Sequence, residues 1–234
     1  MDDGTDHDSL SDEGLEIVSA TRLDGPAFER EAPLGQSLAR LRAGSRIKAR
    51  IFANNTAPLP TIYNQRIRAG AGPDAVVFVH DDVWLEDHFF VDRILEGLAH
   101  FDVIGVAGNR RRLPHQPAWH MLADGSVDRV HLSGAIGQAH AFGAVAQYGP
   151  SGLACELLDG VLLAARRSIL WRNGIHFDPI FDFHFYDMDF CRTARQQQMR
   201  LGTWPVVIGH RSGGNFASEE WKRARECYFA KWTD

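Results

Sequence analysis

Apolar runs alternate with amphipathic segments along the first half of the chain. The uninterrupted run at 75–79, rich in valine, predicts a strand buried on both faces of a sheet. Similar patterns predict strands at 15–20, 46–53 and 102–107, and helices at 34–43, 61–69 and 85–99. Strands that alternate with helices predict a doubly wound, parallel α/β sheet.

The second half of the chain is less regular. Residues 109–155 are rich in Gly, Pro and His, which predicts loops with short strands. An apolar run at 157–165 is interrupted by Asp159-Gly160, and the later patterns predict a helix at 187–199, a strand at 204–208 and an amphipathic helix at 219–232. No repeat or linker divides this part, so we expect a mobile tail over 1–14 and a single domain over 15–234.

Charge is concentrated at the N-terminus. The 234 residues have a formal net charge of -5, and seven acids with no Lys or Arg lie within 1–16. The remaining body is nearly neutral, which argues against a nucleic-acid partner. Three widely spaced cysteines form no CxxC pair and predict free thiols in a reducing compartment. With no signal-peptide pattern and no apolar run of membrane-spanning length, the expected location is the cytoplasm.

Polar side chains follow apolar runs at three separated places: His80-Asp81-Asp82, the aromatic and acidic segment 181–190, and His210 with the loop 211–214. Open α/β sheets bind ligands at the carboxyl ends of their strands. Paired acids are costly to bury, so a cation is expected beside them. Carboxylates with an imidazole suit Mn²⁺, and also Mg²⁺, which would bind a diphosphate. Asp82 and His210 are the predicted metal ligands.

Asp187 is the predicted general base, because a carboxylate that does not bind the metal can take a proton from an acceptor hydroxyl. Simpler interpretations stay open for each residue. Asp82 and Asp187 can cap the helices that follow them. His210 can be a hydrogen-bonded loop residue, and Asp159-Gly160 can be a turn.

The order of these motifs resembles the GT-A-fold glycosyltransferases of the family 2 type. More narrowly, it resembles a bacterial glycosyltransferase-like family that carries an HDD motif and a late motif of the form FHFYDxD, here 183–189. The resemblance covers 17–216. It implies a Rossmann-like, mixed and mainly parallel sheet, and a metal-dependent transfer of a sugar from a nucleotide-sugar, with UDP favoured, to an acceptor hydroxyl with inversion.

The same resemblance implies a role in surface-glycan or polysaccharide synthesis. The acceptor would be a glycan or a lipid-linked one, which would bring the enzyme to the inner membrane as a peripheral protein. The stretch 109–150 is a candidate acceptor region, with a plain surface loop as the alternative. Whether Trp221, Phe229 and Trp232 pack on the core or make a homo-oligomer is open.

The resemblance also assigns site residues, wherever a motif of the family matches this sequence. By resemblance, the nucleotide-sugar contacts are assigned to residues at strand ends and in matching motifs: Ser19, Ala20, Thr21, Asn54, Asn55, Asn64, Asp81, Asp159, Gly160 and Arg166. The supporting residues are His80, His184, Tyr186 and Asp189. Two of these depart from the usual pattern, because His80 replaces the first acid of DxD and Tyr186 replaces the Glu of a Glu-Asp pair. The base is therefore Asp187 or Asp189, with Asp187 preferred.

Two other classes of function remain. A nucleotidyltransferase would need a basic, Gly-rich loop after the first strand, and 20–25 holds one Gly and one Arg. A nucleotide- or carbohydrate-binding protein of the same fold, without catalysis, is favoured by the missing Glu at position 186. Slow hydrolysis of the donor alone separates an active transferase from such a binder.

Overall fold

The computed structural model describes residues 13–41, 46–212 and 218–233. Most of the predicted tail, 1–12, lies outside these ranges, as does 213–214 of the loop after His210. The two described residues of the predicted tail are Glu13 and Gly14, and Glu13 forms an ion pair with Arg166.

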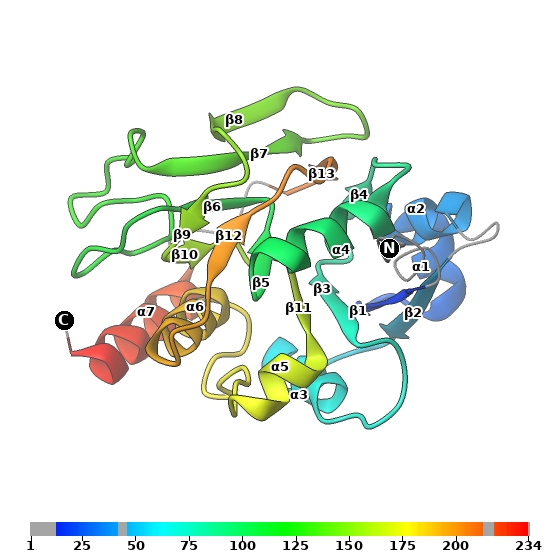
Figure 1. Ribbon diagram of the computed structural model, residues 1–234, viewed down its shortest axis with the longest axis horizontal. Helices are drawn as coiled ribbons and strands as arrows, with labels where there is room; N and C mark the ends of the chain where they lie inside the picture. Colours follow the sequence, from blue (N-terminus) through cyan, green and yellow to red (C-terminus); the bar gives the residue numbers. More distant parts are fainter. Residues whose placement is uncertain (1–12, 42–45, 213–217, 234) are drawn as a thin grey trace, which may run out of the picture.

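The main sheet confirms the predicted α/β class (Figure 1). Its strands, in spatial order, are β2 (Ile47–Phe52), β1 (Leu15–Ala20), β3 (Ala75–Val79), β11 (Leu162–Arg166), β5 (Val103–Gly105), β12 (Leu201–Thr203) and β9 (Ala154–Cys155). β1 pairs in parallel with β2 and β3, whereas β11 runs antiparallel to β3 and β5. The sheet is therefore mixed, and the run at 75–79 is buried as predicted.

A second sheet lies over the carboxyl ends of these strands, and the apolar pattern did not predict it. In spatial order it contains β10 (Leu157–Leu158), β6 (Ala107–Asn109), β7 (Leu132–Gln138), β13 (Ile208–His210) and β4 (Val83–Leu85), with β8 (Val145–Gly149) paired to β7. The strand predicted at 102–107 is thus divided between the two sheets at Val106. Gly134 permits the crossing, because a Cβ there would lie 1.9 Å from the Val106 carbonyl oxygen.

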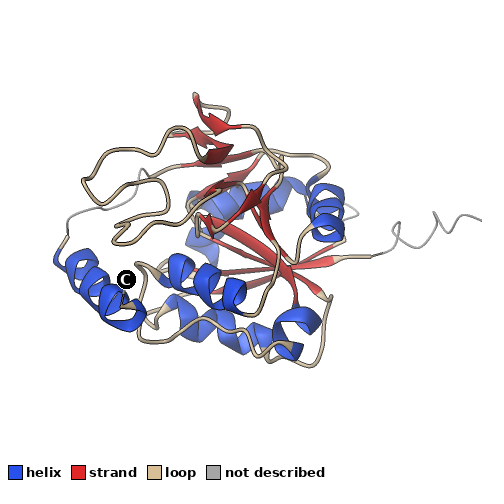
Figure 2. Cartoon of the chain, turned by 60° about the vertical axis from the view of Figure 1, so that its left-hand side comes forward, coloured by secondary structure: helices blue, strands red, loops and turns tan. Residues whose placement is uncertain are grey.

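Helices lie on both sides of the main sheet (Figure 2). They are α1 (Gly25–Glu31), α2 (Pro33–Leu41), α3 (Leu59–Ile67), α4 (Phe90–His100), α5 (Arg167–Arg172), α6 (Tyr186–Gln196) and α7 (Glu219–Trp232). The short helices α1 and α5 were not predicted. Side-chain oxygens cap the N-termini of α1 and α7. Asp24 accepts from the Ala27 N–H, and Ser218 accepts from the Trp221 N–H.

Two predicted elements were wrong in their boundaries. The helix expected at 85–99 begins only at Phe90, because Val83–Leu85 is a strand that pairs antiparallel with β13. The strand expected at 204–208 is instead the connection between β12 and β13, where Val207 is 55% exposed. No helix within the described ranges has the length and apolar character needed to cross a bilayer.

An aromatic cluster beneath the carboxyl ends of β1 and β3 supports α6. Tyr63 packs against Phe78 and Phe177 with ring centroids 4.8 and 5.2 Å apart, and Phe177 stacks on Phe190 at 4.3 Å. Tyr186, the first residue of α6, joins this cluster at 5.8 Å from Phe177. The N-terminus of α6 is thereby held against the end of β3.

Candidate functional site

A cleft of about 640 Å³ opens where the two sheets meet the N-terminus of α6. Ten of the sequence-predicted residues line it: Ala20, His80, Asp81, Asp82, Asp159, Gly160, His184, Tyr186, Asp187 and His210. They come from the carboxyl ends of β1 and β3, the turn between β10 and β11, the start of α6, and β13. Segments more than a hundred residues apart in sequence therefore share one cleft.

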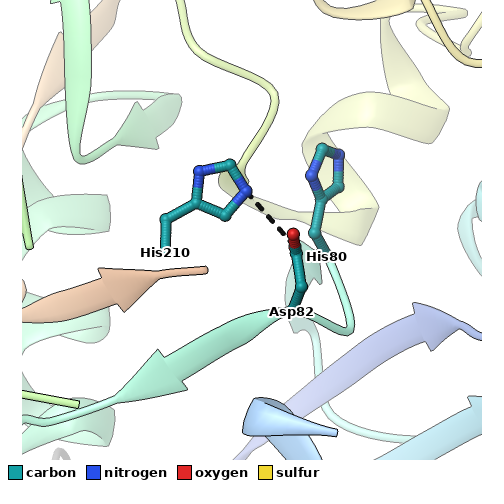
Figure 3. A group of neighbouring side chains, drawn as sticks. All are labelled: His80, Asp82 and His210. Carbon is teal, nitrogen blue, oxygen red and sulfur yellow. Dashed lines mark ion pairs between the residues drawn. The ribbon is translucent and has the colours of Figure 1, made fainter. Parts of the chain in front are cut away.

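Three side chains in the cleft form a cluster that could hold a metal ion. One ligand atom from each of His80, Asp82 and His210 lies within 4.8 Å of the others (Figure 3). The Nε2 atom of His210 is 3.2 Å from Asp82 Oδ1, and the Ser212 hydroxyl donates to Asp82 Oδ2 at 2.6 Å. Two imidazoles and a carboxylate suit a divalent transition ion such as Mn²⁺, so the predicted pair Asp82 and His210 fits this cofactor.

The charges of Asp82 and His210 stabilise each other. Burial opposes ionisation of Asp82, but the hydrogen bond and charge of His210, with the Ser212 hydroxyl, hold the pKa of Asp82 well below its usual range. Burial likewise opposes protonation of His210, but the Asp82 carboxylate outweighs it and raises the pKa of His210. Asp82 and His210 thus form an ion pair, and the ionised Asp82 carboxylate could bind a divalent cation.

His80 differs from His210 in its environment. Burial lowers the pKa of His80, and the nearby charge of Asp82 only partly offsets this. Its Nε2 atom lies 2.9 Å from the Tyr186 hydroxyl, which in turn donates to the Gly160 carbonyl oxygen at 2.8 Å. Burial raises the pKa of the Tyr186 hydroxyl well above its ordinary value, so this group remains a phenol.

Asp187 is the second residue of α6 and lines the cleft. Its Oδ2 accepts from the Gly160 N–H at 3.0 Å and its Oδ1 from the Met188 N–H at 2.8 Å. Burial, followed by the charge of Asp159, raises the pKa of Asp187 to about 7 despite these hydrogen bonds. Phe185, the residue before α6, has a φ of 65°, an uncommon left-handed conformation at the start of a helix.

Asp189, the other candidate base, has a different environment. It does not line the cleft, and its Oδ1 lies 2.7 Å from Lys231 Nζ and accepts from the Trp232 indole N–H at 2.9 Å. Both partners belong to α7. Burial raises the pKa of Asp189, although Lys231 counters part of that effect. Asp189 therefore joins α6 to α7, whereas Asp187 lines the cleft.

Six residues assigned by resemblance do not line the cleft: Ser19, Thr21, Asn54, Asn55, Asn64 and Arg166. Ser19 and Thr21 flank Ala20, which does line the cleft, and the Asn55 N–H donates to the Thr21 carbonyl oxygen at 2.8 Å. The Asn54 N–H donates to the Leu23 carbonyl oxygen at 2.9 Å. Asn54 has a φ of 50°, which asparagine tolerates. These residues shape the turns after β1 and β2.

Asn64 and Arg166 lie away from the cleft and have partners of their own. The Asn64 side chain bonds the Phe177 backbone at both its N–H and its carbonyl oxygen, at 2.9 and 2.7 Å. Arg166 ends β11, which runs antiparallel to β3, so it pairs opposite Ala75 at the far end of the sheet. There it forms an ion pair with Glu13 at 2.5 Å.

An aromatic wall completes the cleft, and the sequence patterns did not identify Trp119 or Tyr148 as part of it. It is formed by Trp119, Tyr148, Phe183 and Trp221, with His120 beside Trp119. Trp119 and Tyr148 pack edge to face at 5.1 Å. Trp119 and Tyr148 fall within 109–150, the stretch expected to contact an acceptor. In the sequence, the only sign of this part of the wall was the group His115, Trp119 and His120.

The fold is that of the GT-A glycosyltransferases. The catalytic domain of Drosophila β1,4-galactosyltransferase 7 with xylobiose has a TM-score of 0.54 at 8% identity, covering 92% of this chain and 79% of that one. A mutant of the same enzyme with manganese, UDP-Gal and xylobiose has a TM-score of 0.52 at 7% sequence identity, and the match covers 90% of this chain and 73% of that one. A Pyrobaculum calidifontis mannosyltransferase with GDP-Man and Mn²⁺ has a TM-score of 0.47 at 14% sequence identity, and the match covers 94% of this chain and 64% of that one.

The chain belongs to the glycosyltransferase-like family, whose sequence model matches residues 36–232. This match confirms the family resemblance and includes every motif that lines the cleft except the end of β1. No curated protein matches the sequence significantly. The similarity to the solved structures, at such low identities, concerns the fold alone.

Proposed function

We propose that the protein transfers a sugar from a nucleoside-diphosphate sugar, specifically a UDP-sugar, to a hydroxyl group of a carbohydrate acceptor. The observation that carries this proposal is one cleft that holds both the His80, Asp82 and His210 cluster and the acid Asp187, which has no cationic partner among the described residues. A structurally similar enzyme that contains manganese, UDP-Gal and xylobiose supports the choice of ligands.

The donor would lie at the carboxyl ends of β1 and β3. Ala20 and Asp81 line this part of the cleft, and the turns at Thr21 and Asn54 border it. A Mn²⁺ or Mg²⁺ ion bound by Asp82 and His210 would supply a Lewis acid to the diphosphate. The carboxylate of Asp82, hydrogen-bonded to Ser212, is oriented for this role before any ion arrives.

Asp187 would act as the base. The acceptor oxygen forms a bond to the anomeric carbon while the bond from that carbon to the phosphate oxygen breaks, and the electron pair leaves with UDP. The hydroxyl proton passes to Asp187, whose pKa of about 7 suits this transfer near neutral pH. Two backbone N–H groups keep the carboxylate in place. A single displacement of this kind inverts the anomeric centre.

The aromatic wall supports a sugar acceptor. Binding sites for small molecules combine apolar and aromatic walls with a few placed polar groups, and Trp119, Tyr148 and Trp221 provide such a wall in the cleft that Asp187 lines. A polysaccharide or lipid-linked acceptor, handled in the cytoplasm or at the inner membrane, rests on the family resemblance alone.

One alternative is a nucleotide-sugar binder that no longer catalyses transfer. It is favoured by Tyr186, which stands where related enzymes carry a second carboxylate. Hydrolysis of the donor in the absence of acceptor distinguishes the two, because water can replace the acceptor hydroxyl in a transferase.

The experiment that tests the proposal is calorimetric titration with UDP, GDP, CDP and ADP, with and without Mn²⁺. Wild type is compared with Asp82→Ala, and Asp92→Ala is the matched control because Asp92 lies on the outside of α4 with a 61% exposed side chain. UDP binding that requires Mn²⁺ and is lost only in Asp82→Ala is the expected result. If no nucleoside diphosphate shows metal-linked binding, the proposal is wrong.

A further inference from the structure

The two residues that depart from the family pattern contact each other. His80 follows β3, and Tyr186 begins α6, more than a hundred residues later. They meet through His80 Nε2 and the Tyr186 hydroxyl oxygen at 2.9 Å. A His in place of an acid and a Tyr in place of an acid therefore form one unit in this chain, next to the metal cluster.

The Tyr186 hydroxyl determines which nitrogen of His80 carries the hydrogen. A tyrosine hydroxyl has a single proton, and here it is donated to the Gly160 carbonyl oxygen at 2.8 Å, which can only accept. Toward His80 the hydroxyl oxygen is consequently the acceptor. His80 Nε2 must then be the donor, and in a neutral ring the lone pair is left on Nδ1.

The free nitrogen faces the metal cluster. In Figure 3, one ring nitrogen of His80 lies on the side toward Asp82 and His210, and the other lies on the far side of the ring. Since Nε2 is engaged by Tyr186, Nδ1 is the atom that faces the cluster. We propose that His80 is a third protein ligand of the divalent ion through Nδ1, and that Tyr186 is the positioning residue that sets its tautomer.

The surroundings of Tyr186 hold it rigidly in this position. Its side chain is 2% exposed and packs against Tyr63 and Phe177. A glycine at position 160 is required for the approach, because a Cβ there would lie 2.6 Å from the Tyr186 hydroxyl oxygen. Partners that fix the tautomer of a metal-binding His typically contribute about 10- to 100-fold in metal affinity.

This inference rests on the metal site of the proposed function, and it is tested by titrating the full chain with Mn²⁺ alone. Tyr186→Phe is expected to weaken Mn²⁺ binding by roughly 10- to 100-fold while the ring keeps its packing. Tyr228→Phe is the matched control, because it removes another buried hydroxyl, from α7, that does not line the cleft. It should bind Mn²⁺ as wild type does.

A double-mutant cycle with His80→Ala separates positioning from a structural role. His80→Ala should weaken Mn²⁺ binding by itself, and adding Tyr186→Phe to it should change the affinity no further. Unaltered Mn²⁺ affinity in Tyr186→Phe would overturn the inference, and so would an equal further loss in the His80→Ala background. Thermal unfolding of the metal-free variants checks that each remains folded.

A spectroscopic readout does not require the metal. Ring ¹⁵N chemical shifts of His80 in the metal-free protein should show hydrogen on Nε2 in wild type and a mixture of tautomers in Tyr186→Phe. Hydrogen on Nδ1 in wild type would contradict the inference whatever the metal does. Absence of any Mn²⁺ binding by wild type would instead refute the metal site of the proposed function, together with the ligand role of His80.

Discussion

The two ends of the main sheet both bury acids, but they treat the charge differently. At the end away from the cleft, Glu16 is fully buried on β1 and forms ion pairs with Arg66, at 2.8 Å, and with Arg167. At the cleft end, the described part of the chain gives Asp187 backbone N–H donors and the like charge of Asp159 nearby. Glu16 is compensated by cations of the protein itself, and among the described residues Asp187 has no such cation.

This difference separates structural acids from functional ones. A buried ion pair with good geometry is satisfied within the fold and gives no reason to expect a ligand. A carboxyl group with a raised pKa in an open cleft is a candidate for proton transfer, because the protein has arranged its environment without neutralising it. Four changes would break or sharpen this comparison.

The largest effect is expected from Asp187→Asn. Asparagine keeps the size of the side chain but cannot accept the hydroxyl proton, so turnover should fall by roughly 10²- to 10⁴-fold. Binding of UDP with Mn²⁺ should change little, because Asp187 is not in the metal cluster. Donor hydrolysis and calorimetry measure the two quantities separately.

Asp189→Asn is the matched control for this change, because Asp189 lies two residues further along the same helix and on a different face of it. Asp189 contacts Lys231 and Trp232 rather than the cleft, so its loss should lower the free energy of unfolding and leave turnover within about tenfold of wild type. Near-normal turnover in Asp187→Asn, with a large loss in Asp189→Asn, would move the base to Asp189.

At the opposite end of the sheet, substitution of Glu16 should change the free energy of unfolding rather than ligand binding. Glu16→Gln leaves Arg66 and Arg167 without their buried counter-charge, which typically costs about 3–5 kcal/mol of the free energy of unfolding. Under conditions where the variant is folded, Mn²⁺ and UDP binding should remain. Urea denaturation with calorimetry checks both, and a normal stability would show that Glu16 is not the acid that holds this end together.

Local patterns predicted the strands at 15–20 and 75–79 because these segments are buried on both faces and their apolar runs are unbroken. They failed where the chain changes sheets. The helix was predicted to begin at Leu85, but antiparallel pairing with the distant strand β13 makes 83–85 a strand. The β-branched run around Val207 reads as a strand, yet it links the two sheets.

The site was predictable to the extent that its residues follow strands. His80 directly follows β3 and Asp82 lies in the same short connection, at the carboxyl end of a strand where open sheets bind ligands. His210 ends β13 of the second sheet, which pairs with β4 directly after Asp82. Arg166 was assigned to the cleft from its motif, but the antiparallel direction of β11 puts it at the other end. Strand direction is not visible in an apolar run, and the aromatic wall depends on loops that have no periodic pattern.

A third prediction concerns pH. The pKa of Asp187 is raised from 3.8 to about 7 in the folded protein, so between these values the folded state holds a proton that the unfolded state has lost. Stability should therefore fall as pH rises through this window and level off above it. Each unit of pKa difference corresponds to about 1.4 kcal/mol, so the fall should exceed that of a surface carboxyl.

Urea denaturation of the metal-free protein at several pH values measures this loss. Asp187→Asn has no such titration, so the stability of the variant relative to wild type should grow between pH 3.8 and about 7. A constant difference between the two proteins would mean that Asp187 is already ionised in the folded state at low pH, like a compensated acid.

The smallest effect is expected from Arg166→Ala. This variant tests whether Arg166 contacts the nucleotide-sugar, as its motif predicts, or lies at the far end of the sheet, as the structure shows. Arg166 lies with Glu13 and Asp74 at the compensated end, and its side chain is 26% exposed. Loss of such a partly exposed pair should cost about 0.2–1 kcal/mol of stability and leave UDP binding with Mn²⁺ unchanged. Tenfold weaker UDP binding would show that Arg166 reaches the donor after all, and the division into a structural and a functional end would not hold for this residue.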